Sequence, residues 1–369
     1  MKERKEVRTL VVKAGTRVLL QGTEALDRRN IERLLNELID ARESGIDTLL
    51  VSSGAIGAGL KPLGFSRRPG TIPDLQACAA VGQILLMQAY NEILQGRGYV
   101  VAQLLLTHED FRDRERYLNL RNTLGALRGH KVLPVVNEND PVAVDEIRFG
   151  DNDVLCALVS NAVDADLTIL LSDVDGLYTE HPRTGANPQR IPVVERVTPE
   201  IEALAFDSDS GLGSGGMSSK IRAAKMVTRF GGTLVLADGK RASVAAILRG
   251  EVDGTKFLPH GSRLAHRKRW IAWSLKESGV LHVDAGAARA VLERGKSLLP
   301  AGVIGCDGEF GEGAAVAVRL EGRTIAKGLV NYPAEVVRRI IGRRSSELKL
   351  LVGEKYFEEV IHRDNLVAL

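Results

Sequence analysis

A glycine-rich segment that ends in a lysine is the strongest chemical signal in the sequence. Residues 210–220 read SGLGSGGMSSK, so four glycines precede the start of a helical pattern. Free backbone N–H groups at a helix start, together with one lysine, favour a bound phosphate. The segment contains GxGxxG, but it lacks the GK[ST] ending of a Walker A loop, and polar residues 199–210 precede it instead of a buried strand. A dinucleotide-binding loop is therefore a weaker interpretation than a phosphate cradle, and a flexible linker is weaker still.

A lysine at the end of the first apolar run is a second candidate for binding phosphate. Lys13 follows residues 9–12 and precedes Gly15 and Thr16, so a close backbone approach and an ammonium charge coincide. A lysine at a strand end more often extends into solvent, and this position alone would favour that interpretation. After the second apolar run, residues 52–59 read SSGAIGAG. This segment suits an anion site at a helix start and tight helix–sheet packing equally well.

Amides and carboxylates gather in two neighbouring segments. Residues 137–140 read NEND and residues 150–153 read GDND. Such side chains could hold a substrate ammonium, orient an amino acid or fix a lysine, although Asn and Asp are also ordinary turn and N-cap residues. Their density beside a buried strand favours a functional role. Residues 172–178, SDVDGLY, follow another apolar run and are equally consistent with a nucleotide contact and with an Asx-type turn.

Short apolar runs alternate with longer amphipathic segments up to about residue 258. The predicted strands are 9–12, 48–51, 100–105, 132–136, 167–171 and 233–237, and the predicted helices include 30–43, 75–94 and 153–162. This alternation is typical of βαβ units and predicts an α/β fold with a largely parallel sheet. Ligands of such sheets bind at the carboxyl ends of the strands, which is where the candidate residues are found.

The pattern changes in the last third of the chain. Residues 261–269, GSRLAHRKR, are polar and basic, and apolar residues alternate with Gly-rich turns from residue 279 onwards. This alternation predicts antiparallel strands and hairpins, with one short helix at 334–341. We therefore divide the chain into an α/β domain at 1–262, a linker at 263–274 and a mostly-β domain at 275–369.

Composition narrows the class of protein. The 369 residues include 50 basic and 47 acidic side chains, and 44% are hydrophobic, as in an ordinary globular protein. This near balance of charge requires no polyanionic partner. Cys78, Cys156 and Cys306 form no CxxC pair and the histidines form no HxxxH pair, so no metal site is predicted. Because neither a signal peptide nor an apolar span of about 20 residues is found, we expect a cytoplasmic protein with no membrane partner.

Together these segments resemble the amino acid kinase family. The stretches that carry the resemblance are VVKAGT (11–16), LLVSSGAIGAG (49–59), AAVGQ (79–83), LLLTHEDFRDRERYLN (104–119), VLPVVNENDPVA (132–143), FGDNDVLCALV (149–159), LLSDVDGLYTEHPR (170–183) and GLGSGGMSSKIRAA (211–224). Two later stretches, VDAGAARAVLERGKSLLPAGV (283–303) and EGRTIAKGL (321–329), resemble the PUA domain. The resemblance implies an αβα sandwich with a mostly parallel central sheet, followed by a small, mostly-β, PUA-like domain.

The resemblance is specific to the branch of the family that phosphorylates the side-chain carboxylate of L-glutamate with ATP and Mg²⁺, at the start of proline synthesis. The residues implied to bind glutamate are Ser53, Asp140 and Asn152. Those implied to bind ATP are Lys13, Ser172, Asp173, Ser214, Gly215, Gly216, Met217, Ser218, Ser219 and Lys220. Lys13 and Lys220 would contact the phosphates as catalytic residues, with Asp153 holding the two lysines in place.

The chemistry agrees with this implication. The glutamate γ-carboxyl group has a pKa of about 4.3, so it is ionised at neutral pH and needs no general base. Mg²⁺ would be held mainly by ATP oxygens and water. Three positions depart from the usual family pattern, which has Ser or Asn at Arg17, a larger aliphatic residue at Ala14 and commonly Thr at Ser172. Arg17 adds bulk and charge beside the first phosphate turn.

The resemblance also implies partners. We expect feedback inhibition by proline, a homo-oligomer (a dimer or a tetramer) and functional coupling to glutamyl-phosphate reductase. RNA is disfavoured but stays open, because residues 279–369 contain 13 Lys and Arg against 12 Asp and Glu. The alternatives are another member of the family, acting on aspartate, acetylglutamate or a nucleotide, and an RNA-associated protein with a PUA domain. A dehydrogenase is a third alternative, but the buried strand that should precede its GxGxxG segment is missing from the sequence.

Overall fold

The computed structural model describes residues 6–22, 25–142, 152–181, 185–205, 216–260, 277–343, 348 and 357–369. The chain divides into two compact units, residues 1–261 and residues 262–369. The predicted linker, 263–274, lies within a segment outside the described residues, 261–276.

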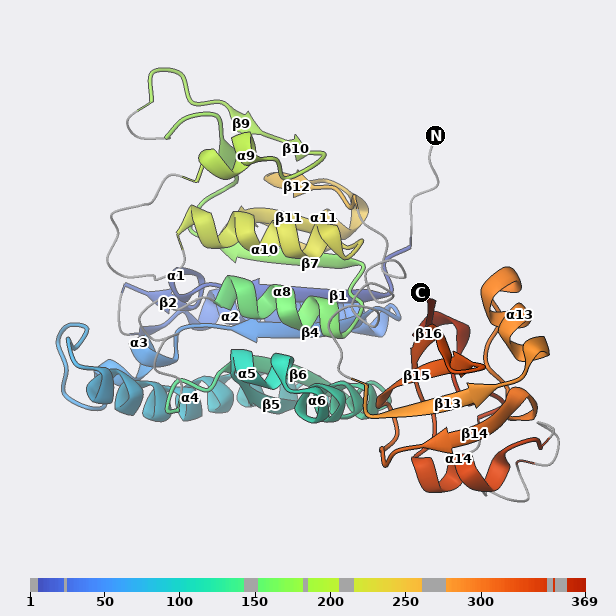
Figure 1. The fold of residues 1–369 in the computed structure, drawn as a ribbon. Coiled ribbons are helices and arrows are strands. Elements are labelled where there is room, and N and C mark those ends of the chain that lie inside the picture. Colours follow the sequence, from blue (N-terminus) through green and yellow to red (C-terminus); the bar gives the residue numbers. More distant parts are fainter. Residues whose placement is uncertain are drawn as a thin grey trace. The chain divides into compact units, whose positions relative to one another are not determined.

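A mostly parallel sheet forms the centre of the first unit (Figure 1). Within the described residues it has eight strands in the order β10-β12-β11-β7-β1-β4-β6-β5. Their bounds are β1 Thr9–Ala14, β4 Asp47–Ser52, β5 Val100–Leu106, β6 Val132–Glu138, β7 Leu167–Ser172, β10 Val193–Val194, β11 Thr233–Asp238 and β12 Thr255–Phe257. All neighbouring strands are parallel except β11 and β12. All six strands expected from the sequence are present, whereas the short strands β10 and β12 were not predicted.

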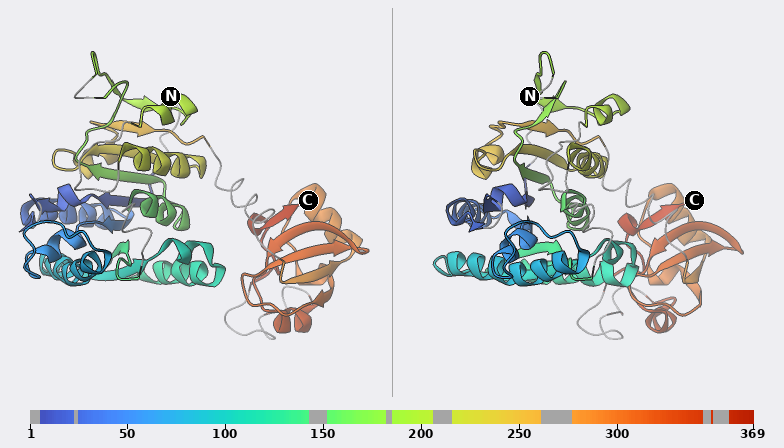
Figure 2. Two further views of the ribbon diagram at one scale, coloured as in Figure 1. Left: turned by 60° about the vertical axis from the view of Figure 1, so that its left-hand side comes forward. Right: turned by 90° about the vertical axis from the view of Figure 1, so that its left-hand side faces the viewer.

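Helices cover both faces of this sheet, which makes the first unit an αβα sandwich, as two further views show (Figure 2). One face carries α2 (Arg28–Glu43), α3 (Ala55–Leu60), α4 (Ile72–Gln95) and α11 (Val244–Arg249). The other carries α6 (Arg114–Leu127), α8 (Asn152–Ala162) and α10 (Met217–Arg229). Leu10 and Val12 pack into the first core and Val11 packs into the second. Both faces of β1 are therefore apolar, as expected for a strand that helices cover on both sides.

Shorter elements connect these layers. They are α1 Thr16–Leu19, β2 Leu20–Gln21, β3 Ala25–Leu26, α5 His108–Arg112, β8 Leu177–Tyr178, β9 Arg190–Ile191 and α9 Pro199–Ala203. None of the described helices is long and apolar enough to cross a membrane.

Glycines allow α3 and α4 to pack with their backbones in contact. A Cβ at Gly82 would lie 1.9 Å from the carbonyl oxygen of Ala55, and one at Gly59 would lie 1.9 Å from that of Cys78. Any larger side chain at either position would force the helices apart. This close packing explains Gly59 within residues 52–59, and it holds α4 against α3, the helix that follows β4.

The second unit contains a five-stranded sheet in the order β14-β13-β15-β16-β17, counted over the described residues. The strands are β13 Gly279–Val283, β14 Val303–Asp307, β15 Ala315–Leu320, β16 Arg323–Leu329 and β17 Leu366–Ala368, and the helices are α13 Ala285–Arg294 and α14 Ala334–Ile340, with single 3-10 turns at Pro300–Gly302 and Arg363–Asn365. Glu321 and Gly322, with φ of 48° and 81°, form the tight turn between β15 and β16. The unit has its own apolar core, and the prediction of a mostly-β C-terminal fold is confirmed.

Candidate active site

The carboxyl ends of four adjacent strands bring the candidate residues together. β7, β1, β4 and β6 are neighbours in the sheet and run in one direction. Lys13 lies near the end of β1, Ser53 follows β4, Asn137 lies near the end of β6 and Ser172 ends β7. The backbone N–H of Ser53 donates to the carbonyl oxygen of Ala14 at 3.1 Å, which joins the ends of β1 and β4.

Two lysines from distant parts of the sequence share one buried carboxylate. Nζ of Lys13 lies 2.7 Å from Oδ1 of Asp153, and Nζ of Lys220 lies 3.1 Å from Oδ2. Asp153 occupies the first turn of α8, Lys220 the first turn of α10, and Lys13 belongs to β1. All three side chains are buried. The structure therefore brings together these three predicted residues, with the carboxylate of Asp153 between the two ammonium groups.

The electrostatics of this group depend on the lysines. Burial by itself would raise the pKa of Asp153, but the Lys13 and Lys220 ammonium groups outweigh that effect. The hydrogen bond from Ser219, whose Oγ donates to Oδ2 at 2.8 Å, acts in the same direction. The pKa of Asp153 is therefore held well below its usual range. The three charged side chains together carry one net positive charge, which suits a bound anion.

The backbone around the lysines is shaped for close approach. Gly15 donates its N–H to the carbonyl oxygen of Leu171 at 3.0 Å, and a Cβ at Gly15 would lie 3.5 Å from Nζ of Lys13. The α10 helix begins after Gly216 with no side chain capping its N–H groups among the described residues and no acidic residue in its first turn. Such a helix start favours an anion. Met217, Ser218 and Ser219 form that first turn together with Lys220.

A cluster of amides lies beside the lysines. Nδ2 of Asn152 is 2.9 Å from Oγ of Ser53, 3.1 Å from the carbonyl oxygen of Ser52 and 3.0 Å from Oδ1 of Asn137. The structure therefore places Asn152 and Ser53, two of the predicted glutamate-binding residues, in direct contact. Asn152 precedes Asp153 in the same helical turn, so the amide cluster and the lysine group are adjacent.

One polar atom of Asn152 lacks a partner among the described residues. Oδ1 of Asn152 is buried and accepts no hydrogen bond within the part of the chain that the structure describes. Buried acceptors in native proteins are nearly always paired, and one left open in a cluster of this kind is suited to a donor on a ligand. An ammonium group is a donor of the right kind.

Ser172 and Asp173 mark the end of β7. Oγ of Ser172 donates to Oδ1 of Asp173 at 3.1 Å. Arg17 forms an ion pair with the Asp173 carboxylate, so this departure from the family pattern links the turn after β1 to the end of β7. Burial would raise the pKa of Asp173, and the Arg17 guanidinium reverses this, so that the pKa lies below its usual value.

Asp140 is placed differently from the other predicted glutamate-binding residues. It follows β6, and its backbone carbonyl accepts a hydrogen bond from Nε2 of Gln76 at 3.3 Å. Together with Gln83 and Gln103 it lines a hollow of about 280 Å³ between α4 and the edge strand β5. Of the residues predicted to bind ATP, Ser214 and Gly215 lie outside the described residues. Residues 143–151, which follow the NEND segment, also lie outside them.

The structure adds residues to this site that the sequence reasoning did not assign. Asn137 was noted in the NEND segment without a role, and Gln83 was quoted only as part of AAVGQ. Gln83 is buried, and Oε1 accepts from Nδ2 of Asn137 at 2.9 Å. A signal for Gln83 exists in the sequence, because it interrupts the apolar stripe Ala79, Leu86 and Tyr90 of α4.

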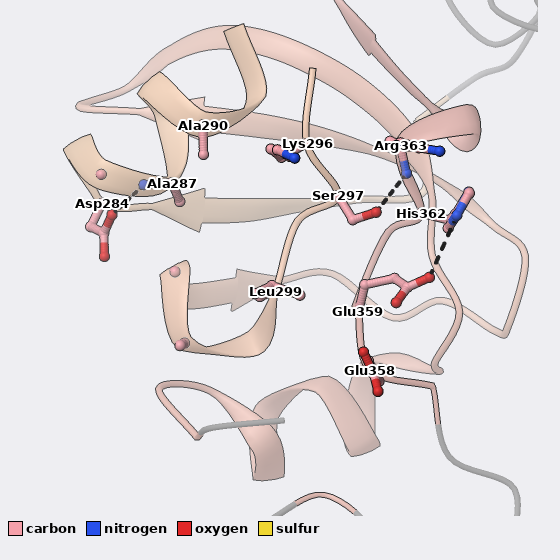
Figure 3. Close-up of a pocket in the computed structure, with 13 residues that line it drawn as sticks. Asp284, Ala287, Ala290, Lys296, Ser297, Leu299, Glu358, Glu359, His362 and Arg363 are labelled. Carbon is pink, nitrogen blue, oxygen red and sulfur yellow. Dashed lines mark hydrogen bonds and ion pairs between the residues drawn. The ribbon is translucent and has the colours of Figure 1, made fainter. Parts of the chain in front are cut away.

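The second unit has a hollow of its own, of about 680 Å³ (Figure 3). The first turns of α13 form one wall, where Asp284 accepts from the N–H of Ala287 at 2.7 Å. Its charged lining includes Lys296 and Arg363 as well as Asp284, Glu358 and Glu359, so the signs are mixed. No group of three or more His, Cys, Asp or Glu side chains suited to a metal ion occurs in the described segments of either unit.

Comparisons with known proteins show the family to which the chain belongs. The profile of the amino acid kinase family matches residues 8–245, and that of the PUA domain matches residues 279–351. Glutamate 5-kinase of Moorella thermoacetica is 49% identical over 366 residues, which cover 99% of this chain and 97% of that protein. Glutamate 5-kinase of Trichlorobacter lovleyi is 46% identical with the same coverage. Among solved structures, carbamate kinase from Giardia lamblia bound to AMP-PNP is 20% identical, with a TM-score of 0.47 over 68% of this chain and 98% of that one.

Proposed function

The chain belongs to the amino acid kinase family, and within it to the glutamate 5-kinases, and on that premise we propose that it transfers the γ-phosphoryl group of ATP to the side-chain carboxylate of L-glutamate. The product is L-glutamyl 5-phosphate, and the reaction is the first step of proline synthesis. The observation that carries this proposal is the buried group of Lys13, Asp153 and Lys220 at the carboxyl ends of the strands.

The chemistry needs positioned cations more than it needs a base. A carboxylate oxygen of glutamate attacks the γ-phosphorus, the bond from that phosphorus to the β,γ-bridging oxygen breaks, and ADP leaves with the electron pair. No proton has to be removed, because the γ-carboxyl group is ionised at neutral pH. The barrier is the approach of one anion to another, and Lys13 and Lys220 would lower it by stabilising negative charge on the transferring group.

Asp153 acts through the lysines. Its two carboxylate oxygens each hold one ammonium group, so the two positive charges are fixed before the substrates bind. Preorganised charges of this kind cost no rearrangement during the reaction. We assign Asp153 the role of holding both lysines in place, with Ser219 as its additional hydrogen-bond donor.

The nucleotide half of the site fits the phosphates of ATP. The N-terminus of α10 offers N–H groups, and Gly15 leaves room beside Lys13. We place the nucleotide against Ser172, Asp173 and the loop of residues 214–220. Mg²⁺ would be held chiefly by nucleotide oxygens and water and would neutralise part of the phosphate charge.

The glutamate half of the site is the amide cluster. Asn152 and Ser53 would bind the amino acid directly, with the open Oδ1 of Asn152 accepting from the substrate ammonium. Asp140 would supply the negative charge for that ammonium. The cluster adjoins the lysines through the neighbouring residues Asn152 and Asp153, so a glutamate bound there would have its side-chain carboxylate near the transferred phosphate.

Regulation and assembly follow from the same premise. We propose proline as a feedback inhibitor, a homo-oligomeric enzyme and delivery of the product to glutamyl-phosphate reductase. The mixed charge in the hollow of the second unit supports an effector or structural role for the PUA-like unit over RNA binding. A cytoplasmic location suits the three cysteines, all of which are free.

The test is ADP release measured with L-glutamate beside L-aspartate, N-acetylglutamate and uridylate. Trapping the product with hydroxylamine identifies an acyl phosphate. Of these four acceptors, we expect only L-glutamate to be turned over. Preferential turnover of another acceptor would assign the chain to a different activity within the family, and ADP release that is independent of every acceptor would remove the proposed reaction.

A further inference from the structure

Gln83 occupies an unusual position behind the amide cluster. It lies on α4, only 7% of its surface is exposed, and its Oε1 accepts from Nδ2 of Asn137. Its own Nε2 is buried and has no acceptor among the residues described. A polar side chain buried at the cost of one unmade hydrogen bond, in the middle of an apolar helix face, calls for a compensating role.

The bond from Asn137 fixes the orientation of two further amides. Because the NH₂ group of Asn137 is directed at Gln83, its Oδ1 is left to accept from Nδ2 of Asn152 and from the N–H of Glu138, at 3.0 and 2.8 Å. Nδ2 of Asn152 is therefore directed at Asn137 and Ser53. Its Oδ1 is turned to the other side and stays open. Reversing any one amide would place two donors or two acceptors face to face.

The same helix also supports the cluster from its other end. The hydroxyl of Tyr90 is fully buried and lies 2.8 Å from Oγ of Ser52. The carbonyl oxygen of Ser52 is in turn an acceptor for Asn152. The close packing of α3 on α4 at Gly82, next to Gln83, holds this helix against α3, the helix that follows β4. One helix therefore contacts two of the three hydrogen-bond partners of Asn152.

We propose that Gln83 is a positioning residue for the amino-acid substrate. Through Asn137 it sets the direction of the Asn152 amide, so that Oδ1 of Asn152 faces the ammonium group. The proposal rests on the proposed function for the identity of the substrate as glutamate. The role requires a hydrogen-bond acceptor at the position of Oε1, and it does not require the NH₂ group.

That requirement separates the relay from simple packing. Gln83→Glu keeps an acceptor for Asn137 but buries a carboxyl group close to Glu138, whereas Gln83→Met keeps the shape of the side chain and removes the acceptor. Burial alone predicts that the methionine variant is the better tolerated of the two. The relay predicts the opposite order for glutamate binding. Gln88→Met is the matched control, because Gln88 lies on the same helix and its amide donates to the exposed Glu92.

The experiment measures steady-state constants and thermal midpoints for the three full-length variants. We expect Gln83→Met to raise the KM for glutamate roughly 3- to 10-fold, the effect of one lost hydrogen bond. Its kcat and its KM for ATP should change less than about twofold, as expected for a loss of ground-state binding. Gln83→Glu should keep a glutamate KM close to that of the wild type although its thermal midpoint falls further, and Gln88→Met should match the wild type throughout.

Two results would overturn the relay. One is a glutamate KM that rises more in Gln83→Glu than in Gln83→Met, in step with the loss of stability. The other is an equal loss of glutamate and ATP affinity in Gln83→Met. If the wild type fails to turn over glutamate, the proposed function is wrong, and crystal structures then judge the relay. The relay requires Asn152 to leave Ser53 or reverse its amide in Gln83→Met, and to stay in place in Gln83→Glu. An amide cluster that is unmoved in both variants refutes the relay.

Discussion

Nζ of Lys220 lies 3.1 Å from Oδ2 of Asp153, although 67 positions separate the two residues in the chain. The other oxygen of the same carboxylate takes Lys13 at 2.7 Å. The carboxylate of Asp153 therefore fixes the positions of the two lysines relative to each other. It is too buried for water to replace the lysines as its partners. Residues that share one partner in this way act as a unit, and removal of one member should disturb the rest.

Lys220→Ala should lower kcat by roughly 10²-fold or more, with a much smaller change in the KM for glutamate, because the lost charge stabilises the transition state. Lys13→Ala should behave in the same way. The double variant should lose less than the product of the two single effects. Steady-state ADP release measures all three.

The matched control is Lys225→Ala. Lys225 lies on the same helix as Lys220, but it is half exposed and pairs with Glu202. A near-normal kcat in Lys220→Ala or Lys13→Ala, similar to that of this control, would take the lysine concerned out of the mechanism.

The family resemblance implied the lysine group, and local signals mark the positions of its members. Lys13 follows a buried apolar run, Lys220 follows a run of glycines, and Asp153 lies in the first turn of a helix. The ends of parallel strands then converge by topology. The strands themselves were predicted for the same reason, since those covered on both faces form continuous apolar runs, as in Leu167–Leu171.

What the sequence could not reveal depends on contacts between elements. The pairing of Gln83 with Asn137 joins a helix to a strand, and no spacing rule connects two positions so far apart. The antiparallel β12 is only three residues long, and its pairing with β11 is a tertiary effect. The ion pair of Arg17 with Asp173 likewise joins two turns that only the sheet order brings together.

Asp153→Asn should destabilise the protein and abolish most turnover, because it leaves two buried ammonium groups without their anion. Removing one partner of a buried ion pair typically costs about 3–5 kcal/mol. The pKa of Asp153 is lower in the folded protein than in the unfolded chain, where it is about 3.9. Its contribution to stability is therefore present above that pH and is lost as the pH falls towards the folded-state value.

Unfolding of wild type and Asp153→Asn across pH tests this sign. The stability gap between the two proteins should be constant from pH 7 to about pH 5 and should shrink by up to about 1.4 kcal/mol per pH unit below about pH 3.9. A gap that widens on acidification would show that the carboxyl group is protonated in the folded state and that the lysines do not control it.

Asp140→Ala should raise the KM for glutamate and leave the KM for ATP nearly unchanged. Its proposed task is to offer negative charge to the substrate ammonium, in the half of the site away from the nucleotide. Inhibition by proline should weaken in the same variant if inhibitor and substrate share that charge. Steady-state constants and a proline titration measure both effects.

The control for the loss of one acidic group is Glu92→Ala. Glu92 is exposed on α4 and pairs with Arg28. Weaker ATP binding in Asp140→Ala, with normal affinity for glutamate, would mean that the two halves of the site are assigned in reverse.

Removal of the C-terminal unit should leave a folded and active kinase. The two units divide at residue 261, and the C-terminal unit has its own apolar core around Leu281, Val316 and Val337. Every proposed catalytic and binding residue, from Lys13 to Lys220, lies in the first unit, and units with separate cores usually fold independently.

The test is to express residues 1–262 and to compare their glutamate-dependent ADP release, proline response and oligomeric state with those of the full chain. We expect kcat to be retained and any change to appear in assembly or in the response to proline. Folded protein without turnover would show that the C-terminal unit completes the active site.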